Sequence, residues 1–390
     1  MVENLPKAEW TTREELAALV AALGAGNLRW VGGAVRDTLL GSSVHDIDAA
    51  TTLMPQEVIN RLDEAGIRTI PTGIDHGTVT AILASGNVEI TTLRKDVATD
   101  GRRATVAFAE DWRDDAARRD FTINALFAHP ETLEIFDYFG GLDDLEARRV
   151  RFIGDAAQRI REDHLRILRY YRFQARFGSD LDERAEVACA ELAPTLKGLS
   201  RERVGWELQN LLSLPDPVQT VRRMHAAGVL PVVLPEVGDE GLAILQAVVT
   251  AEDSAGLPPS AIRRLAALLP ADAKVVEQVA SRLRLSTAMK KRLITASRRQ
   301  GAPGDAHSLA YRLGREEAFD RLLLAGRDPG DLSTWEIPTL PIKGGDIVSR
   351  GVAAGPEVAR VLRKVEDAWV AEGFPGKDRV LQLLTDSLPQ

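Results

Sequence analysis

The sequence predicts an α+β protein with an α/β head of about 140 residues followed by an all-helical remainder. Segments typical of strands and of helices mix up to about Gly141, and signals for strands almost vanish after Leu145. The length of 390 residues is too great for one compact core, so we expect two or more domains. With 45% hydrophobic and 27% charged residues, the composition is typical of a soluble globular protein.

The head elements follow from apolar patterning and from the residues that end each pattern. We expect a first helix over residues 12–23, and then a strand that enters a double glycine, Gly32 and Gly33. The other elements are expected as helices over residues 34–41, 55–65 and 122–128, and as strands over residues 45–51, 78–83, 87–94 and 133–139. Residues 96–119 are polar and charged and have no regular pattern, so much of this segment is expected to be a loop.

After residue 145 one helical pattern follows another, and a last helix is expected to start near Pro356. Cys189 is the only cysteine, which excludes a disulfide framework and a cysteine-based zinc site. No apolar run reaches the roughly 20 residues that a membrane helix needs. Residues 1–10 carry no apolar core of a signal peptide. We therefore expect a cytoplasmic protein without a membrane partner.

The net charge of −8 by itself argues against a nucleic-acid partner, but the charges are unevenly distributed. Residues 145–177 contain nine arginines and only four acidic residues. The arginines of this basic stripe are Arg148, Arg149, Arg151, Arg159, Arg161, Arg166, Arg169, Arg172 and Arg176. The stripe is either a surface for phosphates or the solvated face of a helix, and its composition leaves both open.

Two aspartates stand one residue apart in a strand-like stretch, "VHDIDAAT". In an extended strand the side chains of Asp46 and Asp48 point to the same face and repel each other unless a cation lies between them. The pair therefore indicates a divalent metal site, with Glu89 as a candidate third acid. Taken alone, the same pattern is also that of an ordinary charged surface.

Support for a metal site comes from "VGGAVRD", which places Gly33 in a turn between a strand and a helix. Backbone amides in such a turn can approach a phosphate closely, and Arg36 on the first helical turn can reach the same anion. A phosphate cradle beside two carboxylates is typical of a triphosphate–metal site. A plain tight turn is the alternative, because the glycine spacing fits neither a P-loop nor a dinucleotide fingerprint.

Arginines also precede the segment that we expect to be helical over residues 122–128. In "ARRDFTINAL", Arg118 and Arg119 come directly before Asp120, which we interpret chiefly as the N-cap of that helix. An arginine held beside a helix start can also contact a ribose or a triphosphate.

The stretch "REDHLRILRYYRF" carries charged residues at every third position of an expected helix, so neighbours share a face. Cytosine and adenine both present an amino donor beside a ring-nitrogen acceptor, whereas guanine and uracil present the reverse order. One carboxylate and one arginine, Asp163 and Arg166, can therefore accept C and A and reject G and U, as bidentate pairs do in nucleic-acid grooves. Arg169 and Arg172 can hold phosphates or the base. The alternative is an ion pair within the helix.

Together these motifs resemble those of class II tRNA nucleotidyltransferases, the CCA-adding enzymes and their bacterial poly(A) polymerase relatives, within the polymerase-β-like nucleotidyltransferase superfamily. The resemblance rests on "LRWVGGAVRDTLLGSSVHDIDAAT", "RRDFTINAL", "DYFGGLDDL" and "EDHLRILRYYRF". It is strong over residues 28–177 and looser beyond. It implies a nucleotidyltransferase head with a mixed sheet over residues 1–141, followed by an all-α neck (142–215), body (216–300) and tRNA-binding tail (301–390).

The resemblance also implies roles for single residues. Asp46 and Asp48 would bind Mg²⁺ and act in catalysis. The residues implied to bind the incoming nucleotide are Gly33, Arg36, Arg119, Asp163, Arg166, Arg169 and Arg172. Residues 96–117 would form a flexible loop needed for A addition, residues 137–141 a hinge between head and neck, and residues 201–207 a brace for the nucleotide-selecting helix.

The implied activity is template-independent addition of C, C and A to the 3′ end of tRNA from CTP and ATP, with release of pyrophosphate. The alternatives are a poly(A) polymerase, an A-adding or CC-adding specialist, and a non-catalytic RNA-binding relative. Poly(A) polymerases of this class tend to carry a basic-aromatic "GRRF" element, which is absent between Thr51 and Thr92. The expected flexible loop counts against a CC-only enzyme. The sequence leaves the oligomeric state open.

Overall fold

The computed structural model describes residues 4–44, 46–100, 103–178, 180–299 and 304–388. The chain forms two compact units, Met1–Pro235 and Glu236–Gln390. All the strands of the described residues lie in the first unit, and the second unit is helical. The predicted α+β class is thereby confirmed. The finer division at residues 141, 215 and 300 stays a prediction.

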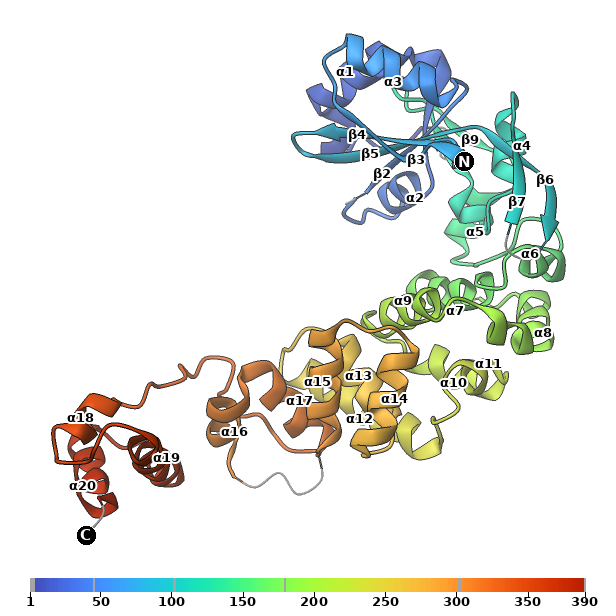
Figure 1. Cartoon of the computed structure of the whole chain (residues 1–390). Helices are drawn as coiled ribbons and strands as arrows, with labels where there is room; N and C mark the ends of the chain where they lie inside the picture. Colours follow the sequence, from blue (N-terminus) through green and yellow to red (C-terminus); the bar gives the residue numbers. More distant parts are fainter. Residues whose placement is uncertain (1–3, 45, 101–102, 179, 300–303, 389–390) are drawn as a thin grey trace. The chain divides into compact units, whose positions relative to one another are not determined.

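The head is built on a seven-stranded mixed sheet with the strand order β3-β4-β5-β2-β1-β8-β9 (Figure 1). Its strands are β1 (Leu28–Val31), β2 (Ile47–Thr51), β3 (Thr69–Gly73), β4 (Thr78–Leu83), β5 (Gly86–Thr92), β8 (Leu126–Ala128) and β9 (Ile135–Asp137). Strands β2 and β5 pair in parallel, with Asp48 opposite Glu89, and the other pairs in this sheet are antiparallel. The sheet therefore brings together carboxylates that lie 41 positions apart in the sequence.

Three head helices lie where apolar spacing predicted them. They are α1 (Glu14–Leu23), α2 (Gly33–Leu39) and α3 (Pro55–Glu64). Helix α3 starts with a proline, whose fixed φ and missing N–H suit the first helical turn, and it buries Val58 and Leu62. The short turn between β1 and α2 places the start of α2 at the end of β1, an interior strand of the sheet next to β2.

Two predictions about the head are wrong. The helix expected over residues 122–128 is a 3₁₀ turn, Thr122–Asn124, followed by strand β8. Leu126, Phe127 and Ala128 are fully buried between β1 and β9, and periodicity cannot distinguish a short buried strand from a short buried helix. The loop expected over residues 96–119 is instead a two-stranded antiparallel sheet, β6 (Arg94–Asp100) and β7 (Arg103–Phe108), followed by α4 (Trp112–Ala117).

Strand β3 lies at the edge of the seven-stranded sheet and was not predicted. Its residues are exposed or half-buried, so the strand lacks the alternation between core and solvent that marks strands in a sequence. The pairing of Thr69 and Ile70 with β4 places it in the sheet. At the edge of the sheet little of β3 is buried, and this accounts for the missing apolar pattern.

The helical part of the first unit continues with α5 (Gly141–Glu146), α6 (Ala156–Glu162), α7 (Arg166–Phe177), α8 (Glu183–Leu192), α9 (Arg201–Leu212), α10 (Val218–Ala226) and α11 (Val229–Val233). The helix predicted through residues 161–173 is therefore interrupted between α6 and α7. Asp163 adopts an extended backbone conformation there, and its Oδ1 accepts a hydrogen bond from the Leu165 N–H (3.1 Å). This local bond offers the backbone an alternative to the helix.

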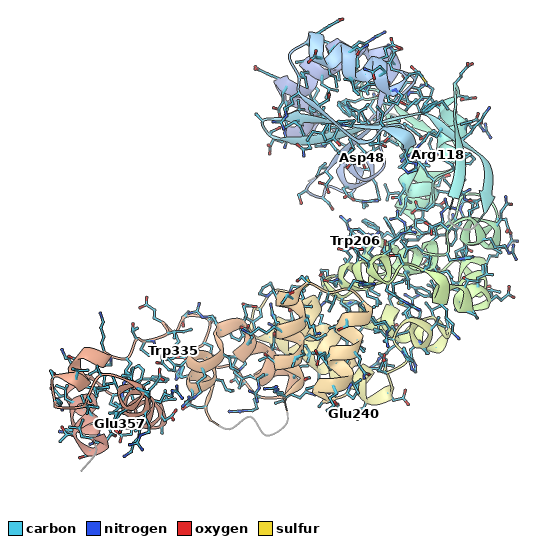
Figure 2. All side chains as sticks on the ribbon, in the orientation of Figure 1. Asp48, Arg118, Trp206, Glu240, Trp335 and Glu357 are labelled. Carbon is cyan, nitrogen blue, oxygen red and sulfur yellow. The ribbon has the colours of Figure 1, made fainter. Side chains whose placement is uncertain are left out.

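The second unit contains α12 (Asp239–Ser254), α13 (Ala261–Leu268), α14 (Ala273–Arg282), α15 (Thr287–Ser297), α16 (Ala306–Leu313), α17 (Arg315–Leu324), α18 (Gly344–Val348), α19 (Pro356–Ala371) and α20 (Lys377–Ser387). A buried ion network joins α12, α13 and α17 through Glu252, Arg263 and Asp320. Between α17 and α18, the Trp335 ring stacks on His307 and contacts Phe374. Figure 2 labels Trp335 in this segment. Among the described helices, none is both long and apolar enough to cross a membrane.

Candidate active site

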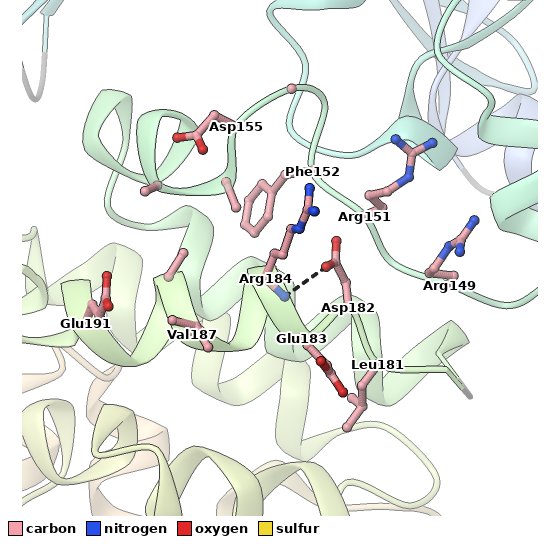
Figure 3. Close-up of a pocket in the computed structure, with 14 residues that line it drawn as sticks. Arg149, Arg151, Phe152, Asp155, Leu181, Asp182, Glu183, Arg184, Val187 and Glu191 are labelled. Atoms are coloured by element: carbon pink, nitrogen blue, oxygen red, sulfur yellow. Dashed lines mark hydrogen bonds between the residues drawn. The ribbon is translucent and has the colours of Figure 1, made fainter.

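The cavities among the described residues of the unit Met1–Pro235 include two with many charged side chains in their walls. The larger, of about 1040 Å³, lies between the segment before α6 and helix α8 (Figure 3). Its wall mixes arginines such as Arg149 and Arg184 with acids such as Asp155 and Asp182, and it contains no predicted site residue. The smaller, of about 430 Å³, is lined by seven of the nine predicted site residues and is therefore the candidate active site.

The smaller cavity is formed by four segments: the turn between β1 and α2, the start of β2, residues 119–124 and one face of α7. The predicted residues that line it are Gly33, Arg36, Asp46, Asp48, Arg119, Arg169 and Arg172. The others are Gly32, Asp37, Ser43, Val44, Asp120, Asn124, Phe173 and Arg176. The wall therefore contains five arginines, which can bind an anion, and four aspartates, which can bind a cation.

Gly32 opens the cavity at the end of β1. Its φ of +70° and ψ of −124° are accessible to glycine and strained for other residues. A Cβ at this position would lie 3.6 Å from Nη1 of Arg119 and 4.0 Å from Oδ2 of Asp48, so it would occupy space between the two groups. The sequence predicts Gly33 as the glycine that binds phosphate, but the positive φ that requires glycine is found at Gly32.

The two predicted metal ligands are placed differently. Asp48 lies on β2, whereas Asp46 precedes the strand and is exposed, so the prediction that both lie on one strand is wrong. Burial, together with the charges of Glu89 and Asp46, raises the pKa of Asp48 to about 6, and the charge of Arg119 opposes this rise. The charge of Arg119 is therefore too small to offset burial and the neighbouring acids at Asp48, a deficit that a bound cation would correct.

The donor set at this position fits a hard divalent cation. Carboxylate oxygens are preferred by such ions, which often take one or two protein carboxylates and complete their coordination with substrate phosphates. Within the described part of the chain, no three His, Cys, Asp or Glu side chains form a group that could hold a metal ion. Glu89 lies opposite Asp48 in the sheet and acts on it through its charge. Asp46 and Asp48 both line the cavity, so their assignment as metal ligands stays a prediction that is consistent with this donor set.

Arg119 is held in place by a buried carboxylate from α4. Asp115 is fully buried, and its Oδ2 accepts hydrogen bonds from Nε (3.2 Å) and Nη2 (3.0 Å) of Arg119. Its Oδ1 accepts from Nε of Arg118 (2.8 Å) and from the backbone N–H of Arg94 at the start of β6 (3.3 Å). Burial alone would raise the pKa of Asp115, but the two guanidinium charges and their hydrogen bonds hold it below its ordinary value.

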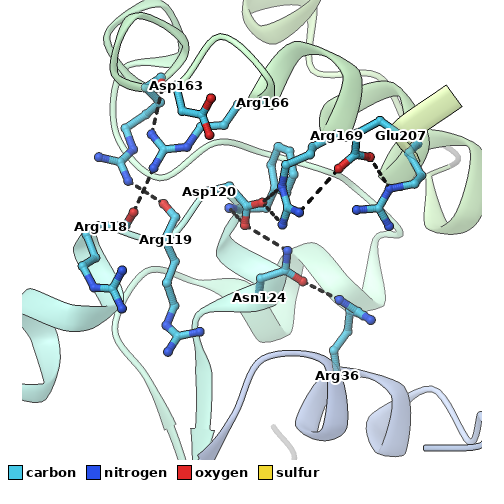
Figure 4. A network of polar contacts seen from close by, with 12 residues as sticks. Arg36, Arg118, Arg119, Asp120, Asn124, Asp163, Arg166, Arg169 and Glu207 are labelled. Carbon is cyan, nitrogen blue, oxygen red and sulfur yellow. Dashed lines mark hydrogen bonds and ion pairs between the residues drawn. The ribbon is translucent and has the colours of Figure 1, made fainter. Parts of the chain in front are cut away.

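A second polar network connects α2, residues 120–124 and α7 (Figure 4). Oδ2 of Asp120 accepts hydrogen bonds from Nε (2.7 Å) and Nη2 (2.5 Å) of Arg169, and its Oδ1 accepts from the Nδ2 of Asn124 (2.9 Å). The Oδ1 of Asn124 in turn accepts a hydrogen bond from Arg36, which also pairs with Asp37. Arg36 is only 4% exposed, so most of its hydrogen-bonding capacity is used within the protein.

The sequence predicted that Asp120 caps an α-helix, and this prediction is wrong. The segment directly after it is the 3₁₀ turn Thr122–Asn124, followed by strand β8. The Asp120 carboxylate is buried against Arg169 instead. Burial would raise the pKa of Asp120, but the charge of Arg169 and hydrogen bonds from Asn124, Arg169 and the Phe121 N–H lower it to about 2. The residue therefore stays ionised and fixes an arginine of α7 at the cavity wall.

The arginines of α7 are further ordered by α9. Oε2 of the buried Glu207 accepts a hydrogen bond from Nε of Arg172 (2.6 Å), and Oε1 lies 3.8 Å from Nη1 of Arg169. The guanidinium carbon of Arg172 lies 4.6 Å from the centre of the Phe173 ring, and those of Arg36 and Arg169 lie 5.2 and 5.5 Å from it. These contacts present three cations around one aromatic ring at the cavity.

Asp163 and Arg166 are not among the residues that line the cavity. Oδ2 of Asp163 accepts a hydrogen bond from Nη2 of Arg203 (2.7 Å). Nη1 of Arg166 donates to the Arg159 carbonyl (2.8 Å) and to Glu162 (2.6 Å), and its Nη2 donates to the Arg118 carbonyl (3.1 Å). In this arrangement the predicted base-reading groups contact protein. Arg166 shares α7 with Arg169 as expected, but the expectation that Asp163 lies on the same helix is wrong.

Asn124 and Asp115 were not predicted as members of the site, and Glu207 was predicted only as part of the brace over residues 201–207. Each of the three orders a residue of the cavity wall. Asn124 lies four positions after Asp120 in "RRDFTINAL", a spacing that was assigned to a helix. Asp115 lies in the segment expected to be a loop. The sequence did carry a signal for Asp115. It lies three and four positions before Arg118 and Arg119, which is the spacing of ion pairs within a helical turn.

Known proteins match this chain over most of its length. The sequence matches the family described as "Poly A polymerase head domain" over residues 28–151 and the one described as "Probable RNA and SrmB- binding site of polymerase A" over residues 179–240. It is 35% identical to CCA tRNA nucleotidyltransferase 1, mitochondrial, of Mus musculus over 382 residues, which cover 92% of this chain and 86% of that protein. The Homo sapiens protein of the same name is 36% identical with the same coverage.

Solved structures agree with these matches. The crystal structure of the Bacillus stearothermophilus CCA-adding enzyme in complex with CTP is 25% identical, with a TM-score of 0.75 over 97% of this chain and 98% of that chain. The Thermotoga maritima CCA-adding enzyme complexed with tRNA shares the fold at a TM-score of 0.70 and 22% identity, with 96% of both chains covered. On the basis of sequence similarity across more than nine-tenths of its length, the chain belongs to the family of CCA tRNA nucleotidyltransferases.

Proposed function

We propose that this protein adds C, C and A in turn to the 3′ end of tRNA, using CTP and ATP without a nucleic-acid template and releasing pyrophosphate. The observation that supports the proposal is one cavity whose wall includes Asp46 and Asp48 together with Arg119, Arg169 and Arg172. Carboxylates for a cation and guanidinium groups for phosphates are the two requirements of nucleotidyl transfer from a triphosphate. A cytoplasmic location remains a prediction from the composition.

In the reaction, the terminal 3′ hydroxyl of the RNA loses its proton to solvent, and its oxygen forms a bond to the α-phosphorus of the incoming nucleotide. The bond from that phosphorus to the bridging oxygen of pyrophosphate breaks. Asp46 and Asp48 would hold the divalent cation that the family requires. We infer Mg²⁺, whose positive charge would stabilise the departing pyrophosphate and lower the pKa of the attacking hydroxyl. Asp48 on β2 and Asp46, which precedes that strand, would determine where that charge lies.

Arg119, Arg169 and Arg172 are proposed to bind the nucleotide phosphates and ribose. Each is held by a buried carboxylate, respectively Asp115, Asp120 and Glu207, so little rotamer freedom remains to be lost on binding. Gly33 and Arg36 would form the back of the same subsite. Arg36 is nearly buried, and we expect it to act mainly by its charge and by fixing Asn124.

Base selection is proposed for Asp163 and Arg166. Their side chains contact Arg203, Glu162 and two backbone carbonyls in this arrangement. A cytosine or adenine edge would therefore have to exchange for some of these contacts. Such an exchange replaces one set of charge-assisted hydrogen bonds by another, so its free-energy cost is small only when the base offers the matching donor and acceptor.

The proposal is tested with three tRNA transcripts that end at the discriminator base, at C and at CC. Each is incubated with Mg²⁺ and with the four nucleotides singly and in mixture, and product lengths are resolved to one nucleotide. We expect growth by three, two and one residues, a stop there, and a requirement for CTP and ATP only. Extension of the CC transcript alone would indicate an A-adding specialist, and a long ladder with ATP a poly(A) polymerase.

A matched variant separates catalysis from RNA binding. Asp46→Ala removes a carboxylate that is exposed and outside the strand, so the fold should be unaffected. We expect loss of extension with retained tRNA affinity in a gel-shift assay. A variant that still extends the transcripts at the wild-type rate would contradict the assignment of Asp46, and wild-type protein that binds tRNA without extending it would be a non-catalytic relative.

A further inference from the structure

Helix α9 exposes a tryptophan beside the candidate active site. Trp206 is 56% exposed, whereas the other five tryptophans are buried or half-buried. Figure 2 labels Trp206 on α9. A single exposed aromatic residue does not by itself indicate a binding site. The residues around Trp206 determine whether it can bind a ligand.

The exposed face of α9 runs along the groups proposed to bind the nucleotide. The guanidinium carbon of Arg172, a residue of the cavity wall, lies 5.8 Å from the centre of the Trp206 ring. One helical turn earlier, Arg203 contacts Asp163, the proposed base-reading carboxylate. The next residue, Glu207, is buried and accepts a hydrogen bond from Arg172. Trp206 therefore lies next to Arg172, a residue of the cavity wall, on an exposed face of α9.

We propose that the indole of Trp206 is a stacking platform for the base of the terminal nucleotide of the RNA. This inference rests on the proposed function, because the terminal 3′ oxygen must come within about 3–3.5 Å of the phosphorus that it attacks. The last base of the RNA must then lie next to the incoming nucleotide. Trp206 is outside the cavity wall, so the base that it can reach is the one that arrives from solvent.

The chemistry of an aromatic platform suits this position. During CCA addition three different RNA ends enter one site in succession: the discriminator base, C and CC. A contact that holds each of them must not read base edges. Stacking on an aromatic ring is tolerant of sequence because every base has a π face, and the positive charge of Arg172 beside the ring favours the adjoining phosphate.

Fluorescence provides a test that is independent of turnover. Wild-type protein and Trp206→Phe are titrated, without nucleotide, with a tRNA acceptor-stem hairpin that ends in CC and with one that lacks the single-stranded end. We expect the CC hairpin to quench part of the wild-type emission and the blunt hairpin to quench less. The difference should vanish in Trp206→Phe, since the other tryptophans remain. Equal quenching in both proteins, or wild-type quenching by CTP alone, would overturn the proposal.

Kinetics supply the second test, with Trp206→Leu as the variant that loses the ring and Trp206→Phe as the variant that keeps an aromatic face. We expect Trp206→Leu to raise the KM for CC-ending tRNA about 10- to 100-fold and to leave the KM for ATP unchanged, and Trp206→Phe to restore most of the loss. The matched control is Val187→Ala, which truncates a 57% exposed side chain on α8 and should change neither KM. An unchanged KM for tRNA in Trp206→Leu refutes the platform while wild-type extension leaves the proposed function intact.

Discussion

The position of Arg119 depends on Asp115, and the substitution Asp115→Asn tests that dependence. Asparagine has nearly the same shape and removes the negative charge that two guanidinium groups share. It also leaves the Arg94 N–H at the start of β6 with at most a weaker acceptor. The variant therefore alters a contact between the base of the β6–β7 hairpin and the cavity without changing a residue that lines the cavity.

The magnitude follows from the contacts. A hydrogen bond to a charged group contributes about 1.5–3 kcal/mol, and removing one partner of a fully buried ion pair costs about 3–5 kcal/mol. The side chains of Arg118 and Arg119 are 20% and 19% exposed and can turn toward water, so the loss should lie at the lower end, about 2 kcal/mol of unfolding free energy. If a free Arg119 loses its directed contact to the nucleotide, kcat/KM for CTP should fall about 10- to 100-fold, since 1.4 kcal/mol is about tenfold.

The assay combines urea unfolding with single-turnover extension of the transcript that ends at the discriminator base. The matched control is Asp320→Asn in the second unit. Asp320 is also fully buried between two arginines, Arg263 and Arg292, and is remote in sequence from the cavity. We expect both variants to lose comparable stability and only Asp115→Asn to lose kcat/KM for the nucleotide. If Asp115→Asn kept its wild-type kcat/KM within twofold, the reasoning that Asp115 positions Arg119 for catalysis would be wrong.

Three further predictions follow from the same structure. The double variant Asp163→Ala with Arg166→Ala should incorporate GTP and UTP at a rate comparable to that of CTP, because the groups that reject them are gone; continued rejection in a primer-extension assay would refute a protein template. Asp120→Asn should be less stable than wild type by about 2 kcal/mol near pH 7, because the folded-state pKa of Asp120 is about 2. A carboxylate whose pKa is lowered by folding stabilises the folded state above its ordinary pKa near 4, and this contribution is lost as the pH falls toward 2. The difference in urea midpoint between wild type and Asp120→Asn should therefore narrow below pH 4. Gly32→Ala should lower stability by about 1–3 kcal/mol through its backbone conformation and reduce extension, whereas Gly26→Ala, with no atom within 4 Å of the added Cβ, should be near neutral in a thermal melt.

The sequence by itself determined the fold class, most head elements and seven of the fifteen residues that line the cavity. Residue type and spacing were sufficient for this. Glycines between a strand and a helix, aspartates at alternate positions and arginines at every third position each restrict the local backbone and the charge that it carries. These are properties of neighbours in the chain, which a sequence displays directly.

Only the tertiary structure decided which acids bind which arginines. Asp120 was interpreted as a helix cap because a cap is the nearest use of an aspartate in the chain, whereas its partner Arg169 is 49 positions away. The same holds for Glu207 with Arg172, 35 positions apart. Local spacing also could not decide that residues 126–128 form a strand, because their pairing partner is β1. Contacts across the fold depend on the packing of whole elements, which no short stretch of sequence contains.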